Sequence, residues 1–271
     1  ASFVASLRTT LQLSALRFRP YRLASPEATP ELRSPPSCPF SSISRTWKLT
    51  VEGLVERPLA LTYEGLKALP SASQLLTLEC ISNEVGGDLM GNAQWKGVPL
   101  SHLIREAGVK AGVRKVVLHA ADDYSDSIVL EKALEPGVII AYEMNGVPLP
   151  DAHGFPARLL VPGIYGMKNV KWLTRIELVD YDYQGYWQKR GWSDSAVINT
   201  MSRIDVPQEY DGYTPGEVGS IGGVAFAGDR GIVEVEVSTD SGKTWTKAQV
   251  KEALSPYTWV LWTKEWAPPG P

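Results

Sequence analysis

The sequence predicts a mixed α+β domain followed by a shorter β-sandwich. Up to Pro207, candidate strands and short helices interleave without the regular βαβ alternation of a parallel sheet. After Pro207, short alternating strands are joined by turns rich in Gly, Asp and Ser, which is typical of a sandwich. The 271 residues, 44% hydrophobic and 21% charged, suffice for one large and one smaller domain. We therefore expect a tail or linker over 1–45, a first domain over 46–207 and a second over 208–271.

The N-terminal segment has the composition of a tail. Its first 25 residues hold four arginines, and no acidic residue precedes Glu27. Organelle transit peptides and disordered tails share this composition, and we favour the tail. The Pro/Ser-rich run over 34–42 then predicts a linker.

The first domain is predicted from hydrophobic spacing and helix caps. Period-two alternation over 47–55 predicts the first ordered strand. Thr62 and Pro70 bound a short helix over 62–70, and Gly108 predicts the end of a second helix over 100–107. The remaining elements predicted for this domain are strands over 115–120, 158–161 and 176–179, an acidic turn over 122–126 and a short helix over 130–134.

Short alternating segments also predict the second domain. Its strands are expected over 219–226, 231–238 and 244–250, with a turn over 238–243. About 65 residues are fewer than the roughly 100 of a complete sandwich. We therefore expect closing strands after Trp266 that this sequence does not contain.

Charge and cysteine usage exclude several classes of protein. A net charge of -3 provides no general basic field for nucleic acid or anionic lipid. No apolar run approaches the ~20 residues needed to span a bilayer. The sequence has no CxxC or CxxCH motif, and His102, His119 and His153 are widely separated, which argues against zinc, iron–sulfur and haem sites. A disulfide between Cys38 and Cys80 is the less favoured interpretation, because Cys38 lies in the linker run.

Cys80 marks the place where chemistry is expected. It lies in the run LTLECISNEVGG over 76–87, where an apolar stretch ends at a polar, glycine-bearing turn. A thiol at the end of a strand can be a nucleophile, a soft-metal ligand or a packed core residue. On this run alone, core packing is the commonest interpretation for a lone cysteine.

Three further segments resolve this choice when they are read in order after Cys80. They are AYEMNGVPLP over 141–150, HGFPARLLVPG over 153–163 and GMKNVKWL over 166–173. Together with the Cys80 run they resemble the molybdenum-pterin domain of the sulfite oxidase family over 47–207, and a weaker match continues to the C-terminus. The resemblance implies a molybdenum-pyranopterin cofactor with Cys80 as the protein ligand of the metal. It also implies an immunoglobulin-like dimerisation domain after the first domain.

The resemblance also implies which residues hold the pterin. His153, Arg158, Asn169, Val170 and Lys171 match the family's cofactor-contacting positions, and Asp122 is a looser match. The chemistry agrees, because arginine can clamp a phosphate with two hydrogen bonds and lysine adds a point charge. Without the resemblance, such residues are more often a strand-edge arginine, solvated lysines and a turn histidine.

The substrate residues are less clearly marked. The arginines that sulfite-oxidising members carry before the first strand and after the metal cysteine are not recognisable here. Gln184 occupies the place of the expected active-site tyrosine, so Tyr186, or Tyr183 beside it, is predicted to substitute. We predict Arg190 as the oxyanion-binding residue. Lys189, Arg203 and Arg230 are other available cations, and Trp192 is a nearby aromatic residue.

The resulting functional hypothesis is a molybdenum-pterin oxidoreductase that moves an oxygen atom to or from a small oxyanion or an S- or N-oxide. Sulfite oxidation is favoured, although turnover is expected to be poor because the family's arginines are missing. Electrons would pass to a separate protein such as a cytochrome, the chain would form a homodimer, and the resemblance favours an extracytoplasmic location. Two alternatives stay open: a reductase of nitrate or of a sulfoxide, and a binding or assembly module without cofactor.

Overall fold

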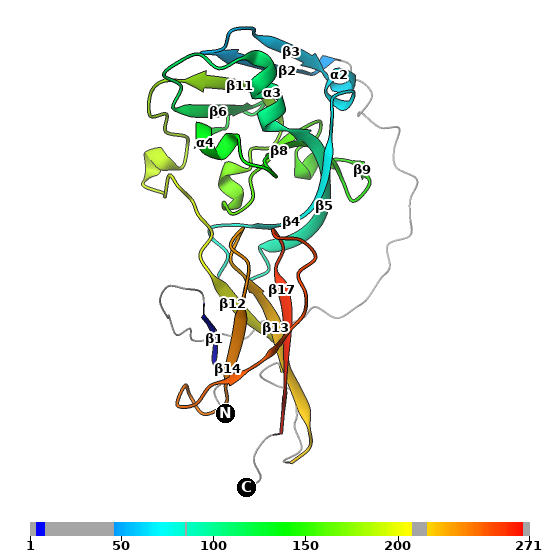
Figure 1. Cartoon of the computed structure of the whole chain (residues 1–271), viewed down its shortest axis with the longest axis vertical. Coiled ribbons are helices and arrows are strands. Elements are labelled where there is room, and N and C mark those ends of the chain that lie inside the picture. Colours follow the sequence, from blue (N-terminus) through cyan, green and yellow to red (C-terminus); the bar gives the residue numbers. More distant parts are fainter. Residues whose placement is uncertain (1–3, 9–45, 85, 208–215, 268–271) are drawn as a thin grey trace. The chain divides into compact units, whose positions relative to one another are not determined.

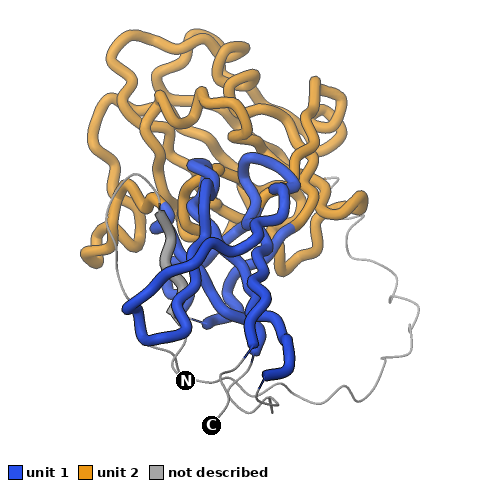
Figure 2. Tube along the Cα trace, turned by 60° about the horizontal axis from the view of Figure 1, so that its bottom comes forward, with its two compact units in different colours: residues 1–25, 77–92, 198–271 blue, residues 26–76, 93–197 orange. Residues whose placement is uncertain are grey.

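The computed structural model describes residues 4–8, 46–84, 86–207 and 216–267, with only the backbone for 4–8 (Figure 1). These residues form two compact units, coloured orange and blue in Figure 2. Unit 2 contains the described residues within 46–76 and 93–197, and unit 1 contains those within 4–8, 77–92 and 198–267. The predicted domain boundary at Pro207 stays a prediction. Cys38 and the Pro/Ser-rich run lie outside the described residues.

One sheet of unit 2 has five strands in the order β3-β2-β11-β6-β7. They are β3 (Leu59–Thr62), β2 (Lys48–Gly53), β11 (Leu173–Val179), β6 (Lys115–Ala120) and β7 (Ser125–Val129). β2 and β11 run parallel, and the other neighbours are antiparallel. The strands predicted near 47–55, 115–120 and 176–179 are confirmed, and β7 takes up the end of the predicted acidic turn.

A second sheet has the order β10-β8-β5-β4, with β9 paired to β8. Its strands are β10 (Arg158–Leu160), β8 (Ile139–Met144), β5 (Met90–Pro99), β4 (Ala72–Glu79) and β9 (Val147–Pro148). β4 and β5 each contain residues of both units. The predicted strand at 158–161 is confirmed as β10. β5 and β8 were not predicted.

The described helices are short and lie within the predicted ranges, although the first ends at Lys67, before the predicted boundary at Pro70. They are α2 (Tyr63–Lys67), α3 (Leu100–Ala107) and α4 (Leu130–Ala133). The Thr62 side chain accepts a hydrogen bond from the Gly65 amide at 3.1 Å, and Gly108 ends α3 with φ +70°. The described residues also contain three single 3₁₀ turns, η1 (Asp151–His153), η2 (Gly166–Lys168) and η3 (Gln188–Arg190).

The predicted fold class is therefore confirmed only in part. Strands dominate the described residues, and the longest described helix, α3, has 8 residues. The mixed α+β prediction overstated the helices. No described helix is long and apolar enough to cross a membrane.

Unit 1 contains two further sheets. One has the order β12-β13-β17-β16, formed by β12 (Met201–Val206), β13 (Gly219–Phe226), β17 (Val260–Trp266) and β16 (Gln249–Val250). The other has the order β1-β14-β15, formed by β1 (Val4–Arg8), β14 (Glu234–Ser238) and β15 (Thr246–Lys247). The prediction for 219–226 is confirmed, 231–238 is shortened to β14, and 244–250 divides between the two sheets. β1 lies in the stretch predicted as a tail, and the immunoglobulin-like assignment stays a proposal.

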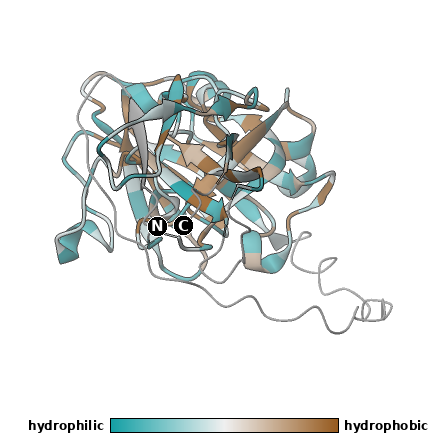
Figure 3. Ribbon diagram, turned by 90° about the horizontal axis from the view of Figure 1, so that it is seen from below, coloured by the Kyte–Doolittle hydropathy of each residue, from teal (hydrophilic) through white to brown (hydrophobic). Residues whose placement is uncertain are grey.

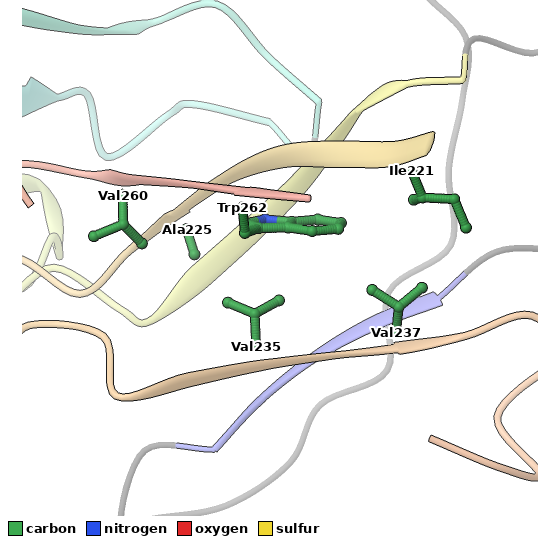
Figure 4. Close-up of a cluster of buried hydrophobic side chains, with 6 residues drawn as sticks. All are labelled: Ile221, Ala225, Val235, Val237, Val260 and Trp262. Atoms are coloured by element: carbon green, nitrogen blue, oxygen red, sulfur yellow. The ribbon is translucent and has the colours of Figure 1, made fainter. Parts of the chain in front are cut away.

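The core of unit 1 lies between these two sheets. Val235 and Val237 of β14 point toward Trp262 of β17 and Ile221 of β13 (Figure 4). The alternation of the sequence places these side chains inward, because residues two apart on a strand share a face. Along the chain, hydrophobic residues gather on strands while turns are mostly hydrophilic (Figure 3).

Candidate functional site

A cavity of about 250 Å³ opens in unit 2 where the predicted motif segments meet. Five of the predicted cofactor residues line it: Asp122, Arg158, Asn169, Val170 and Lys171. The aromatic residues Tyr124, Trp172 and Trp187 also line it. Segments that are up to 65 residues apart, from Asp122 to Trp187, thus contribute to a single cavity.

Arg158 is the most unusual residue of this cavity. It is 5% exposed. Its guanidinium donates to the carbonyl oxygens of His153 and Asn169, each at 3.1 Å, and its Nε has no partner. No carboxylate pairs with it among the described residues. Burial lowers the pKa of Arg158 to about 10, so its charge is retained at neutral pH without a counter-ion, which is costly unless a ligand supplies one.

Lys171 provides a second cation at the cavity. Its Nζ donates to the Ala152 carbonyl at 3.1 Å and lies 4.2 Å from the centre of the Trp172 ring. Burial and the neighbouring Arg158 charge lower the pKa of Lys171, while Asp122 opposes this effect. Gly154 lets the Lys171 side chain pack against the backbone after η1, since a Cβ at position 154 would lie 2.8 Å from the Cβ of Lys171.

Asn169 and Val170 line the cavity and form hydrogen bonds with backbone groups of neighbouring segments. The Asn169 Oδ1 accepts from the Val161 amide at 2.7 Å, and its Nδ2 donates to the carbonyls of Ile164 and Tyr165. Val170 is buried, and its carbonyl accepts from the Leu159 amide. The Asn169 side chain is therefore occupied in holding its own loop.

His153 and Asp122 stand at the margin of this arrangement. His153 is exposed at the end of η1, outside the cavity lining, and its ring centre lies 6.4 Å from that of Trp95. Burial and the charges of Arg158 and Lys171 lower the pKa of His153, which favours the neutral imidazole. Asp122 is exposed and closes its turn by accepting from the Tyr124 amide at 3.2 Å.

A buried charge network supports the wall that contains Tyr124. The Lys168 ammonium donates to Asp126 Oδ1 at 2.8 Å, to the Ser127 carbonyl at 2.7 Å and to Asp194 Oδ1 at 3.2 Å. The Tyr124 hydroxyl donates to Asp126 and, at 2.7 Å, to the Met167 carbonyl beside the cavity. The sequence reading did not assign this network.

Tyr186 and Arg190, predicted as catalytic residues, contact one another. The guanidinium carbon of Arg190 lies 3.5 Å from the Tyr186 ring centre, and Nη1 donates to the Tyr186 carbonyl at 2.8 Å. Both are exposed, and of this segment only Trp187 lines the cavity. The alternative Tyr183 donates or accepts a hydrogen bond with Ser125 at 2.6 Å. Gln184 is exposed.

Cys80 belongs to unit 1, directly after β4. Its thiol is half-buried and free of any disulfide, and its Sγ lies 3.0 Å from the Ser82 hydroxyl. Asn83 closes the turn. Its backbone N–H donates to the Cys80 carbonyl, and its side-chain Oδ1 accepts from the Leu89 backbone N–H. The predicted glycine-bearing turn after a strand is thus confirmed. The role of Cys80 as metal ligand stays a prediction.

The other candidate cations are already engaged. Arg203 pairs with Asp205 at 2.6 Å and donates to the Gly87 carbonyl at 2.7 Å. Arg230 donates to the Ile198 carbonyl at 2.8 Å. The Lys189 ammonium lies 5.7 Å from the Tyr183 ring centre.

The donors and walls of the cavity suit a flat, anionic ligand. A buried guanidinium with an unpartnered Nε needs an anion, and aromatic side chains accommodate a planar ring system. The sequence model of a family described as "Oxidoreductase molybdopterin binding domain" matches residues 37–187. The chain belongs to this family. The match confirms the family predicted from Cys80 and the three motif segments, and molybdopterin is the cofactor that the sequence predicts.

Individual relatives agree with this assignment. The chain is 34% identical over 270 residues to the mitochondrial sulfite oxidase of Drosophila melanogaster, covering 80% of this chain and 46% of that protein. It is 32% identical over 154 residues to the uncharacterized oxidoreductase YuiH of Bacillus subtilis, covering 57% and 76% respectively. The crystal structure of the sulfane dehydrogenase SoxCD from Paracoccus pantotrophus matches with a TM-score of 0.71 and 27% identity, covering 82% of this chain and 63% of that one. The chain therefore spans about half the length of the sulfite oxidase of Drosophila.

Proposed function

We propose that this chain is an oxidoreductase that binds a molybdenum-pyranopterin in the Arg158 cavity and oxidises a small oxyanion, with sulfite favoured. The observation that carries this proposal is the buried Arg158 guanidinium, which faces a cavity and has no carboxylate partner among the described residues. The names of the sulfite oxidase and sulfane dehydrogenase relatives support an inorganic sulfur substrate.

The residues of the cavity would divide the work of holding the cofactor. Arg158 and Lys171 would hold its phosphate, since a guanidinium and an ammonium make strong charge-assisted hydrogen bonds. Trp172 and Trp187 would line the ring system, and Asn169 and Val170 would fix the loop that approaches it. Cys80 would supply a thiolate, which suits a soft metal. The bound cofactor supplies the redox-active metal and the oxygen-atom transfer.

The substrate would need cationic donors of its own. A small dianion competes with its hydration only when several fixed donors face it. Arg203 is neutralised by Asp205, so we assign this role to Arg190, with Tyr186 beneath its guanidinium. One exposed arginine is a weak substitute for the missing family arginines, and this supports slow sulfite turnover.

Steady-state kinetics with an artificial electron acceptor test the substrate. We expect the full-length protein to oxidise sulfite, with a specificity constant well below the diffusional range of ~10⁸ M⁻¹s⁻¹. A value near that range would contradict the expected weakness of the substrate site. Absence of sulfite oxidation, with reduction of nitrate or a sulfoxide in the same preparation, would favour the reductase alternative.

The electron acceptor, the oligomer and the compartment are proposals from the family resemblance. A separate redox protein such as a cytochrome would receive the electrons, and a homodimer would form through the residues after 210. The extracytoplasmic location favoured by the resemblance belongs with these proposals. Light scattering on the full-length protein tests the dimer, and a monomer across the micromolar range would contradict it.

Removing Arg158 is expected to empty the cavity. Hydrogen bonds to charged groups contribute about 1.5–3 kcal/mol each, so Arg158→Ala should lower bound molybdenum and pterin by about tenfold or more. Elemental analysis and the fluorescence of released, oxidised pterin measure this loss. Arg105→Ala is the matched control, because Arg105 is exposed on α3 and its loss should leave cofactor content unchanged. Full occupancy in Arg158→Ala would place the phosphate elsewhere.

A further inference from the structure

The Trp95 ring lies next to the buried Arg158 guanidinium, which has no carboxylate partner among the described residues. The guanidinium carbon of Arg158 lies 5.3 Å from the centre of the Trp95 ring. Trp95 is 2% exposed, and its indole N–H has no hydrogen-bond partner. We propose that the Trp95 ring is a positioning element of the anion site, which holds the Arg158 guanidinium by a cation–π contact. This inference rests on the proposed binding of cofactor in the Arg158 cavity.

The strand register explains why these two residues meet. Arg158 of β10 is in register with Ala141 of β8, and Ala141 is in register with Gly97 of β5. Trp95 precedes Gly97 by two residues, across a register irregularity between Lys96 and Gly97. Gly97 cannot carry a side chain, since a Cβ would lie 2.2 Å from the Ile140 carbonyl oxygen. Two small residues, Ala141 and Gly97, therefore lie in register beside Arg158.

The hydrogen bonds of Arg158 leave its orientation under-determined. Its two donors to protein reach the carbonyls of His153, the last residue of η1, and Asn169, which directly follows η2. A carboxylate partner would fix the guanidinium but would also cancel the charge that an anion needs. An aromatic face attracts the cation through its quadrupole and leaves the net positive charge available.

Trp95 also contacts the second predicted cofactor residue. The His153 ring meets it edge-on, with centres 6.4 Å apart. A single buried side chain thus contacts both Arg158 and His153. Neither Trp95 nor its strand was singled out by the motif segments, because Trp95 lies outside all of them.

A fluorine series on one ring separates this role from packing. Trp95 would be replaced, in the full chain, by tryptophan carrying one to four ring fluorines, which withdraw electron density with little change in shape. Molybdenum and pterin per purified chain should fall stepwise with fluorine number, and the rate of cofactor loss in mild urea should rise. The same series at Trp192, which is 40% exposed and does not line the cavity, should be flat. A flat series at Trp95 would overturn the proposal.

Conventional variants give an independent reading. Trp95→Phe should retain most of the cofactor, whereas Trp95→Leu, which has no ring, should lose about tenfold, equivalent to 1.4 kcal/mol. Equal losses in both would show that only volume matters and would overturn the proposal.

A third measurement needs no cofactor. In the NMR spectrum, the Arg158 Nε–H should carry a ring-current shift that disappears in Trp95→Leu. If the shift is absent from the parent, the contact is wrong. If the parent protein purifies without cofactor, the proposed function fails. The inference about Trp95 fails separately if the Arg158 Nε–H signal of the parent is unchanged in Trp95→Leu.

Discussion

Replacement of Cys80 by serine is expected to abolish turnover while the fold is kept. A hydroxyl is a hard, weakly acidic ligand, so it cannot replace a thiolate on a soft, redox-active metal. The loss of activity should exceed the ~10–100-fold that follows mutation of residues that hydrogen-bond to a metal ligand. Molybdenum content and sulfite turnover measure the effect, and the thermal transition reports the fold.

The structure explains why the fold should survive this change. The turn is held by backbone groups of Cys80, whose amide donates to the Leu89 carbonyl at 2.9 Å and whose carbonyl accepts from Asn83. The thiol itself approaches only the Ser82 hydroxyl among the contacts described. Ser82→Ala is therefore the matched control and should retain most of the activity. Unchanged turnover in Cys80→Ser, with normal metal content, would contradict the assignment of Cys80 as ligand.

Local signals account for the parts of the fold that the sequence predicts well. Thr62 and Gly108 mark helix ends through interactions within one turn, and the structure confirms both. β13 matches its predicted range, Gly219–Phe226. Such signals need no knowledge of distant contacts.

Signals that depend on pairing were missed. β5 contains Gly91, Gly97 and Pro99, which disfavour strands when considered alone, yet it pairs with β8 over Trp95 to Pro99. β8 is a continuous buried run, Ile139 to Tyr142, without alternation. Periodicity cannot distinguish such a run from a buried helix segment.

The candidate site shows the same division. The motif segments predicted Arg158 and Lys171, which line the cavity. They also gave Asn169 as a cofactor contact, which stays a prediction: Asn169 lines the cavity, and its side chain holds the loop. Trp95 lies on a strand that no motif covers, and Asp126, predicted as part of an acidic turn, lies in β7 and is 0% exposed.

Breaking the buried pair between Asp126 and Lys168 is expected to give the largest loss of stability. Both side chains are 1% exposed and are joined at 2.8 Å. Lys168→Met leaves the Asp126 carboxylate buried without its cation, which costs about 3–5 kcal/mol. Urea and thermal unfolding of the full chain measure this loss. Lys67→Met is the control, because Lys67 and Glu64 form an exposed pair at 3.5 Å, which contributes only about 0–1 kcal/mol.

A second substitution separates charge from packing. Asp126→Asn in the Lys168→Met background should recover part of the loss, since a neutral amide no longer needs the cation, and contacting residues couple by about 0.5–3 kcal/mol. A loss below about 1 kcal/mol in Lys168→Met would contradict a structural role for the pair. Bound pterin should fall with stability, because Asp126 also accepts from the Tyr124 hydroxyl at the cavity wall.

The pH dependence of the same network provides the final test. Burial alone would raise the pKa of Asp194, but the hydrogen bond from Lys115 and the charge of Lys168 lower it below its ordinary value. The unfolded chain then binds a proton more readily than the native one, so this contribution is complete above the unfolded pKa of about 3.9 and is lost as the pH falls through the lower native pKa. Removing Lys168 removes one of the two cations that depress this pKa. The parent should therefore lose stability more steeply than Lys168→Met between about pH 4 and pH 2, and parallel curves would show that Asp194 does not sense the Lys168 charge.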